Sequence, residues 1–510
     1  MRKLLASIIT ICILVCFVST PVLAYQAPGD DSQTESAPAE APSLVDNTVT
    51  TKHKVTIKGK TIAYTAEAGT MALESGGDQC EMFYTAYTKD GVKDKSTRPI
   101  TFAFNGGPGS SCIYIHFGCL GPRRVELDEK GTPISLPAKV VDNKNSILDM
   151  TDLVFIDPVG TGYSKAADES KSSNFYGYTN DIRSVGDFIR QYINRNNRWG
   201  SPKYIAGESY GTARAVGLCK YLSDSYSMNV NGLMLISCIN DYEALSFGGR
   251  NETPYAVFIP TYAAAAWYHG VLSKKYQDME LEEYLKEVTT FVEKEYVPAL
   301  FMGNKLSKSE INSIAGKLAD YLGVSKDFIL ENNLRFDLEP YSKELLKDRK
   351  LMIGRYDERL TGPVTSGSIY DGTADPSGAI VDTAFGDAYQ KYITDELGFK
   401  TDTPYVPMNL DVNYEWDFPL DGGIGYLSQE DIIHDCLSKN RFLKIWVLCG
   451  YFDGATPFYG AEWQYNHVFL NDDAAERITF THYPSGHMIY IDKESFDKLR
   501  EDAEKWYGVK

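Results

Sequence analysis

The sequence predicts an α/β fold in which a mostly parallel central sheet is flanked by helices. Short apolar runs of strand length recur along the chain, helix-like segments separate them, and several of the runs end in Gly-rich loops. Buried strands that alternate with helices are typical of a parallel sheet covered on both faces. The predicted strands lie at 54–65 (with a turn at Gly59), 81–88, 100–104, 153–157, 232–236, 444–448 and 477–481, and the predicted helices at 181–196, 214–222 and 494–507.

The composition is that of a globular protein with an acidic surface. Hydrophobic residues make up 43% of the 510 residues, charged residues make up 24%, and the formal net charge is −18. This negative charge argues against binding to nucleic acid or to anionic membrane surfaces. The 35 tyrosines favour broad amphipathic surfaces such as a substrate cleft, although core packing can use most of them.

The N-terminus has the pattern of a secretory signal peptide. A basic start precedes an apolar stretch over 4–18, and Ala24 ends a run of small or modest residues suited to cleavage. The alternative is a membrane anchor, but the apolar stretch is short for a span and Pro21 interrupts its end. We therefore expect a signal peptide over 1–24 and an exported protein without a membrane span after its removal.

The rest of the chain divides into three kinds of sequence. Residues 25–50, rich in Ala, Pro, Ser and acidic residues, predict a disordered linker. Residues 51–267 and 437–510 carry the strand and helix pattern described above and predict the α/β core. Residues 268–436 begin with charged helical patterns and continue with a Gly-, Tyr- and Asp-rich stretch over 357–387. We expect them to form an insertion that covers the active edge of the sheet.

A candidate nucleophile lies in Gly207-Glu208-Ser209-Tyr210-Gly211, between a predicted strand and a predicted helix. This is the G-x-S-x-G pattern in the strand–turn–helix setting that a nucleophile elbow requires. The turn is tight and strains the backbone of the serine, and glycines leave room on either side of it. The pattern also arises by chance, so its interpretation depends on the rest of the chain.

A base and an orienting acid follow in the order expected for such an elbow. Asp453 comes after the predicted strand at 444–448, and His487 lies in a loop after the strand at 477–481. His482, within or just after that strand, is the structural alternative to His487. Asp453 has an alternative role as a turn residue, but its place at a strand end favours the catalytic role. The sequence thus predicts Ser209, His487 and Asp453 as nucleophile, base and orienting acid.

Two backbone N–H groups are candidates for an oxyanion hole. One belongs to Tyr210, directly after the nucleophile, and the other to Gly107 in the loop Asn105-Gly106-Gly107-Pro108-Gly109. A side chain at Gly107 would bar a substrate oxygen from the backbone, although the loop alone could be a plain Gly-rich turn. Each such donor stabilises the transition state by roughly 3–4 kcal/mol.

Together these motifs resemble those of the serine carboxypeptidase family, and they occur in that family's order over most of the mature chain. The motifs are Asn105-Gly106-Gly107-Pro108-Gly109-Ser110-Ser111, Asp157-Pro158-Val159-Gly160-Thr161-Gly162-Tyr163-Ser164, Gly207-Glu208-Ser209-Tyr210-Gly211, Gly450-x-x-Asp453 and Gly486-His487-Met488. The resemblance implies an α/β-hydrolase fold with a largely helical cap insertion and the removal of single residues from peptide C-termini. It also implies that Asn105 and Glu208 help to hold the terminal carboxylate of the substrate, beside Cys119 and Met488.

The sequence departs from that family at Cys119, where well-known members carry a glutamate that pairs with the elbow glutamate. Two close carboxyls share a proton, whereas one alone tends to ionise. We therefore expect an ionised, unpartnered Glu208 that repels a terminal carboxylate near neutral pH. Recognition of the terminal carboxylate would then be weakened, or other donors such as Asn105, Arg123 or Arg124 would take it over. The alternative for the two arginines is a surface or structural ion pair. Ser110 stands where many members carry a bridging cysteine, so the family's disulfides are not expected here.

No cofactor or metal site is expected. Seven cysteines follow the signal peptide, without C-x-x-C spacing, and several lie in apolar runs typical of buried thiols. One or two disulfides remain possible from the sequence.

The leading interpretation is a secreted serine carboxypeptidase that acts on peptides with free C-termini through an acyl-enzyme on Ser209. An esterase or acyltransferase with the same triad is the enzymatic alternative, because the catalytic groups are shared. An inactive surface-displayed binding protein is the alternative of another class, which an intact triad disfavours.

Overall fold

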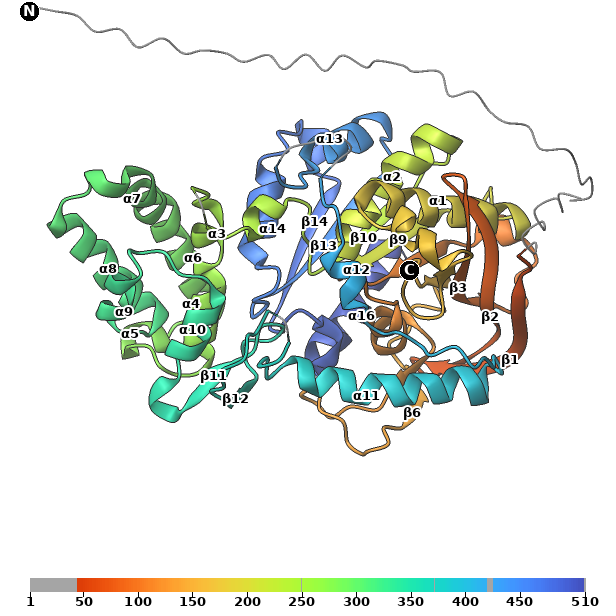
Figure 1. The fold of residues 1–510 in the computed structure, drawn as a ribbon, viewed down its shortest axis with the longest axis horizontal. Coiled ribbons are helices and arrows are strands. Elements are labelled where there is room, and N and C mark those ends of the chain that lie inside the picture. Colours follow the sequence, from red (N-terminus) through yellow and green to blue (C-terminus); the bar gives the residue numbers. More distant parts are fainter. Residues whose placement is uncertain (1–43, 249, 371, 420–424, 509–510) are drawn as a thin grey trace, which may run out of the picture. The chain divides into compact units, whose positions relative to one another are not determined.

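The computed structural model describes residues 44–248, 250–370, 372–419 and 425–508 (Figure 1). The expected signal peptide over 1–24 and most of the expected linker over 25–50 lie outside these residues. Within the described part, residues 47–50 already belong to strand β1 (Asn47–Ile57), which pairs along its whole length with β2 (Lys60–Ser75). Regular structure thus begins inside the range expected for the linker.

The described residues form a ten-stranded central sheet in the order β1-β2-β3-β7-β4-β9-β10-β13-β14, with β8 paired to β3. Strands β7, β4, β9, β10, β13 and β14 are parallel, and β1, β2 and β3 are joined antiparallel to one edge. The predicted mostly parallel sheet is confirmed. The other bounds are β3 (Asp78–Lys89), β4 (Ile100–Phe104), β7 (Asp152–Ile156), β8 (Lys165–Ala166), β9 (Lys203–Glu208), β10 (Gly232–Ile236), β13 (Lys444–Gly450) and β14 (Ile478–Tyr483), with β5 (Arg123–Val125) and β6 (Val140–Asp142) forming a separate pair.

Helices cover both faces of the sheet, because successive residues of each buried strand point to opposite sides. On one face, α1 (Tyr178–Arg195) and α2 (Tyr210–Tyr226) pack on strand residues such as Phe102 and Leu235. On the other face, α16 (Lys493–Tyr507) and α11 (Gly378–Lys391) contribute to a second core with Met234 and Trp446 (Figure 1). The alternation explains why continuous apolar runs, rather than alternating ones, mark these strands in the sequence.

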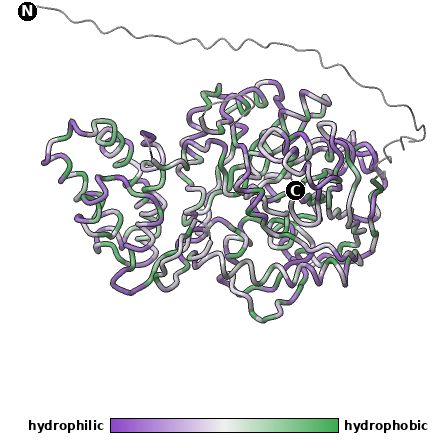
Figure 2. The backbone as a smooth tube through the Cα atoms, viewed as in Figure 1, coloured by the Kyte–Doolittle hydropathy of each residue, from purple (hydrophilic) through white to green (hydrophobic). Residues whose placement is uncertain are grey.

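The chain between β10 and β13 is mostly helical and starts its helices at Thr253, before the expected boundary at residue 268. Along these helices hydrophilic and hydrophobic residues alternate (Figure 2), as expected for helices that bury one face. The bounds are α3 (Thr253–Val257), α4 (Ile259–Tyr268), α5 (Lys274–Gln277), α6 (Leu281–Phe291), α7 (Val297–Met302), α8 (Lys308–Leu322), α9 (Lys326–Glu331), α10 (Leu338–Glu344), α12 (Leu410–Tyr414) and α13 (Glu430–Lys439), with a hairpin of β11 (Leu351–Ile353) and β12 (Thr361–Pro363).

Many of the tyrosines serve the core of this helical region. Tyr341 donates its hydroxyl to the carbonyl of Tyr262 at 2.7 Å, and Tyr296 donates to the carbonyl of Leu334 at 2.5 Å. Each ring is buried, and its one polar atom forms a hydrogen bond with the backbone.

The described chain contains no helix long and apolar enough to cross a membrane.

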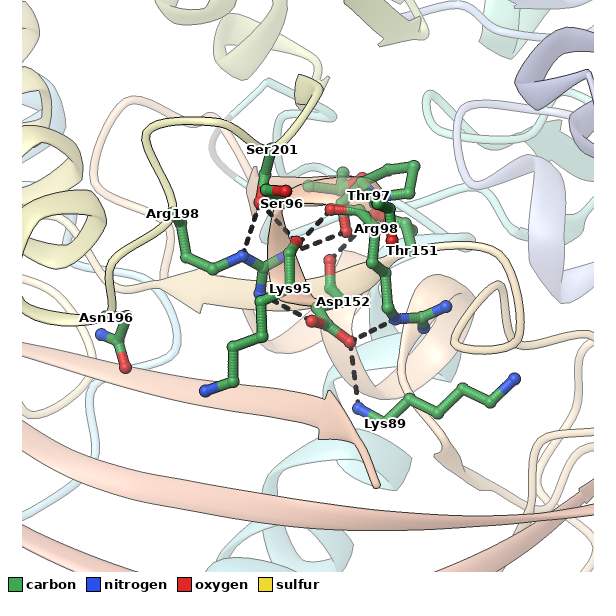
Figure 3. A network of polar contacts seen from close by, with 12 residues as sticks. Lys89, Lys95, Ser96, Thr97, Arg98, Thr151, Asp152, Asn196, Arg198 and Ser201 are labelled. Atoms are coloured by element: carbon green, nitrogen blue, oxygen red, sulfur yellow. Dashed lines mark hydrogen bonds and ion pairs between the residues drawn. The ribbon is translucent and has the colours of Figure 1, made fainter. Parts of the chain in front are cut away.

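A buried ion network ties together the amino ends of the central strands, at the edge opposite the elbow (Figure 3). The carboxylate of Asp152, at the start of β7, accepts from Arg98 Nε at 2.7 Å and from Arg198 Nη1 at 2.6 Å. Arg198 also donates to the carbonyl of Arg98 at 2.9 Å and to Ser201 Oγ at 2.7 Å. These residues flank β4 and β9, so the network fixes the strands that carry the loops of the candidate site.

Candidate active site

Ser209 lies at the turn between β9 and α2, as the elbow pattern predicts. Its backbone has φ 59° and ψ −131°, a left-handed conformation that is costly for a residue with a side chain. A Cβ at Gly207 would lie 2.1 Å from the carbonyl oxygen of Gly211, and one at Gly211 would lie 2.9 Å from that of Asn105, so the turn leaves no room for a side chain at either glycine. Ser209 is partly exposed while Glu208 and Tyr210 are buried, which leaves the serine as the accessible side chain of the elbow.

Asp453 and His487 form a close pair after the ends of β13 and β14. His487 Nδ1 and Asp453 Oδ2 are 2.8 Å apart, and the two side chains are almost fully buried. Asp453 also accepts from the N–H groups of Ala455 and Thr456 and, at 2.7 Å, from Thr456 Oγ1. These bonds fix the carboxylate so that it orients the imidazole.

The sheet topology explains why three residues far apart in sequence lie at the same edge of the sheet. Strands β9, β10, β13 and β14 are parallel neighbours in that order. Their carboxyl ends, which carry Ser209, Asp453 and His487, therefore share one edge of the sheet. His482 lies elsewhere, with its Nε2 2.9 Å from Glu462 and its ring stacked on Tyr451.

The surroundings of His487 favour its charged form. Burial lowers the pKa of His487, but the Asp453 carboxylate and its hydrogen bond raise it more, and Glu208 raises it further. The net pKa lies above the usual value of 6.5. A base stabilised as an imidazolium in this way is suited to take a proton from a neighbouring hydroxyl.

The loop over residues 105–109 packs against the first turn of α2. A Cβ at Gly106 would lie 2.4 Å from the backbone nitrogen of Tyr210, and Gly107 has φ 96°. Arg214 Nη1 donates to the carbonyl of Asn105 at 2.6 Å and joins the loop to α2. Among the described residues no hydrogen bond engages the N–H of Gly107, so this donor is available.

A buried group that the sequence did not reveal supports the same turn. Asp181 on α1 accepts from Tyr210 Oη at 2.9 Å and from Arg214 Nε at 2.7 Å. The guanidinium of Arg214 also lies 5.0 Å from the ring centre of Phe104. A single buried ion pair thus links α1, the start of α2 and the strand that precedes the loop.

Glu208 has a partner that the sequence analysis did not identify, so the expectation of an unpartnered carboxyl is wrong. Tyr490 Oη donates to Glu208 Oε2 at 2.8 Å, and both side chains are buried. Burial raises the pKa of Glu208 to about 7, against the lowering effects of His487, Tyr490 and Asn105. The carboxyl is therefore largely protonated below neutral pH, which corrects the expectation of an ionised group.

Cys119 is fully buried near this carboxyl, and burial followed by the charge of Glu208 raises the pKa of its thiol. Met488 follows the candidate base and is 8% exposed.

Neither arginine considered for carboxylate recognition is free in the site. Arg123 pairs with Glu396 at 2.8 Å and with Asp142, as the structural alternative predicts. Arg124 lies over the ring of Phe496 and donates to the carbonyl of Tyr490 at 3.4 Å.

Residues 354–359, which we call the bracing segment, hold both catalytic loops from the insertion. The N–H of His487 donates to the carbonyl of Tyr356 at 2.6 Å, and the N–H of Glu358 donates to the carbonyl of Phe452 at 2.9 Å. Arg359 Nη1 donates to the carbonyl of Pro484 at 2.6 Å. The segment has no sequence periodicity that could have predicted these contacts, and only its place in the insertion could be predicted.

All seven cysteines of the described chain are free and buried. The described residues also contain no group of three or more His, Cys, Asp or Glu side chains arranged to hold a metal ion.

Comparison with known proteins gives consistent results. The family model for serine carboxypeptidases matches residues 58–335. Serine carboxypeptidase-like 9 of Arabidopsis thaliana is 26% identical over 189 residues, which is 35% of this chain and 40% of that protein. Serine carboxypeptidase-like 36 of the same plant is 32% identical over 133 residues, 25% of each chain. The alignments thus span well under half the length of these relatives.

Among solved structures, a prohormone-processing carboxypeptidase from Saccharomyces cerevisiae, Kex1(delta)p, aligns over 87% of this chain and 91% of its own. The TM-score is 0.55 and the sequence identity is 17%, a likeness that bears on the fold. It confirms the predicted α/β-hydrolase fold. With the family model matching more than half of its residues, the chain belongs to the serine carboxypeptidase family.

Proposed function

We propose that the protein is a serine-type carboxypeptidase that removes C-terminal residues from peptides through an acyl-enzyme on Ser209. The observation that carries this proposal is the Asp453–His487 pair at 2.8 Å on the sheet edge that also presents the strained Ser209. Membership of the serine carboxypeptidase family supports the choice of peptide C-termini as substrates.

In the proposed reaction, Ser209 Oγ attacks the carbonyl carbon of the last peptide bond while His487 takes the hydroxyl proton. Asp453 holds the imidazole in the required orientation and stabilises its charged form. The N–H groups of Gly107 and Tyr210 donate to the oxyanion. His487 then protonates the leaving amine, the C–N bond breaks, and an ester on Ser209 remains. In the second half, His487 takes a proton from a water molecule, which adds to the acyl carbon of this ester. The bond to Ser209 Oγ then breaks, the shortened peptide leaves as an acid, and His487 returns the proton to Ser209.

The free C-terminus is recognised by Asn105 and Glu208, with Cys119 and Met488 beside them. A protonated Glu208 donates a hydrogen bond to the terminal carboxylate, whereas an ionised one repels it. Because burial raises the pKa of Glu208 to about 7, this recognition operates in acid and weakens as the pH rises through neutrality. The buried Tyr490 phenol, rather than a second carboxyl, occupies one oxygen of Glu208.

The organisation of the chain follows the same proposal. Residues 1–24 direct export to an extracytoplasmic location, and the residues from 25 to the start of β1 at Asn47 connect them to the enzyme. Residues 51–267 with 437–510 act as the catalytic core, and residues 268–436 act as a cap. The contacts of residues 354–359 with both catalytic loops support a cap that takes part in building the site.

The test is a panel of peptides, each offered as the free acid, the C-terminal amide and a C-terminal ester, with products read by mass spectrometry. The proposal expects loss of single residues from the free acids, slow or no cleavage of the amides, and no activity in Ser209→Ala. Cleavage of esters without cleavage of any free acid would identify an esterase instead. Cleavage of acids and amides at equal rates at pH 5 would contradict recognition of the terminal carboxylate.

A further inference from the structure

The side chain of Arg355, in the bracing segment, is held between two tyrosine rings. Its guanidinium lies 5.1 Å from the ring centre of Tyr356 and 5.7 Å from that of Tyr370. Arg355 Nη1 also donates to Tyr356 Oη at 3.4 Å. Two cation–π contacts and a hydrogen bond restrict the rotamers of a side chain that is otherwise costly to order. The cation is thus preorganised.

The ring of Tyr356 connects this cation to the candidate catalytic histidine. The ring of Tyr356, on which the guanidinium rests, has its centre 5.4 Å from that of His487. The electrostatics agree: burial lowers the pKa of His487, Asp453 and Glu208 raise it, and Arg355 lowers it. The charge of Arg355 therefore acts on the imidazole that faces the reacting bond.

Among the described residues Arg355 forms no ion pair with an acidic side chain, although the chain has 69 acidic and 51 basic residues. Throughout the described chain, no carboxylate oxygen lies within the 4.0 Å of its guanidinium that would make an ion pair. Its neighbour in the segment, Arg359, pairs with both Asp357 and Asp492. Asp375 contacts Arg355 only at the backbone, where its carboxylate accepts a hydrogen bond from the Arg355 N–H at 2.9 Å. The same carboxylate oxygen also accepts a hydrogen bond from the hydroxyl of Ser377.

Arg355 also lies at a partly exposed position. Arg355 and Tyr356 are partly exposed, and Tyr370 is 44% exposed. A partly exposed cation stacked on aromatic rings keeps its hydrogen-bonding edge free, and that planar edge matches a carboxylate in a bidentate arrangement. The buried arginines Arg98 and Arg198 differ from Arg355 in this respect, because both pair with the carboxylate of Asp152.

We propose that Arg355 binds a carboxylate of the substrate beside the scissile bond, so that the enzyme prefers peptides with an acidic residue there. This inference rests on the proposed carboxypeptidase function. Two sources of the carboxylate share this chemistry, namely an Asp or Glu side chain of the last two residues and the terminal carboxylate itself. Glu208 and Asn105 already serve the terminal carboxylate, so the side chain is the expected source.

The experiment compares matched peptides that carry Glu or Gln at the last or at the penultimate position, each as free acid and as amide. In the wild-type protein kcat/KM should be about 10- to 100-fold higher for Glu than for Gln at one of the two positions. In Arg355→Gln this ratio should fall to near one, and Arg355→Glu should favour Lys at the same position. Arg441→Gln is the matched control, because Arg441 is exposed and also rests on an aromatic ring, that of Phe442. It should retain the wild-type ratio.

A second measurement does not depend on peptide cleavage. The same peptides are tested for protection of Ser209 against a fluorophosphonate, at a pH where the label reacts. Stronger protection by Glu than by Gln peptides, lost in Arg355→Gln, supports the inference even if the peptides are not hydrolysed. A different outcome is that Arg355→Gln weakens protection by the free acids but not by the amides, and equally for Glu and Gln peptides. That result identifies the terminal carboxylate as the group that Arg355 binds. Equal protection and equal kcat/KM for all peptides in both proteins would overturn the inference and leave the proposed function in place.

Discussion

The phenol of Tyr490 donates a 2.8 Å hydrogen bond to the carboxyl of Glu208, the residue that directly precedes the candidate nucleophile. Tyr490 is three residues after His487 in the chain and Glu208 is one residue before Ser209, so this bond connects the elbow to the loop that carries His487. It also gives Glu208 a neutral hydrogen-bond donor.

Replacing Tyr490 with Phe should shift the pH dependence of free-acid cleavage. Burial raises the pKa of Glu208 to about 7, and the Tyr490 hydrogen bond opposes that rise. Without the bond the pKa of Glu208 rises further, so the alkaline decline of kcat/KM for free acids should move to higher pH. Tyr221→Phe is the control, because Tyr221 donates to Asp187 at 2.9 Å, at a carboxylate other than Glu208. Superimposable pH profiles for wild type and Tyr490→Phe would exclude the role assigned to this bond.

Glu208 should also make the stability of the folded chain depend on pH. Its pKa is raised on folding from 4.5 to about 7, so its contribution is fully present below pH 4.5 and is lost as the pH rises through 7. The full loss is on the order of 3 kcal/mol. Denaturant unfolding at pH 5 and pH 8 should show a smaller difference in Glu208→Gln than in wild type. An equal difference in both proteins would mean that Glu208 does not titrate in this range.

Asp453→Asn should abolish most of the activity while the fold is retained. The amide cannot hold His487 in the same tautomer or stabilise its charged form, so kcat should fall by about 10⁴-fold. Steady-state hydrolysis of a free-acid peptide measures this, with circular dichroism as the check on folding. Asp435→Asn is the control, since Asp435 only pairs with Lys220 and Lys439 at the surface. Retention of more than a tenth of wild-type kcat in Asp453→Asn would remove Asp453 from the triad.

Asp152→Ala should reduce stability strongly. The substitution leaves Arg98 and Arg198 buried without their shared carboxylate, and breaking such a group costs about 3–5 kcal/mol. Removing a surface pair through Asp435→Asn should cost at most about 1 kcal/mol. Urea denaturation compares the two variants. Similar losses in both would show that the buried network is not important for stability.

The sequence was most informative where local pattern and topology coincide. The strands at Ile100–Phe104 and Gly232–Ile236 have the predicted limits, because an unbroken apolar run bounded by polar residues leaves one buried-strand solution. The meeting of Asp453 with His487 could be predicted because neighbouring parallel strands end at one edge of the sheet. The strands at the N-terminus were harder to predict, since β2 extends to Ser75, ten residues beyond the predicted end at residue 65.

The partners of the candidate site could not be predicted from sequence. Tyr490 reaches Glu208 across 282 positions of the chain, and no periodicity marks such a contact. The bracing segment lies in an irregular stretch, and its bonds to His487 and Phe452 use backbone groups that any residue provides. Helix α11 (Gly378–Lys391) likewise begins inside the Gly-, Tyr- and Asp-rich stretch over 357–387, whose sequence shows no clear periodicity.

The most direct test of the central claim is the mass-spectrometric mapping of a fluorophosphonate adduct on the intact protein. The account predicts one adduct on Ser209, at a rate that His482→Gln leaves near the wild-type value and that His487→Gln reduces by several orders of magnitude. His482 lies in β14 and His487 follows the same strand. The comparison therefore isolates the 2.8 Å pairing of His487 with Asp453. An adduct elsewhere, no adduct, or equal labelling in the two histidine variants would contradict the account.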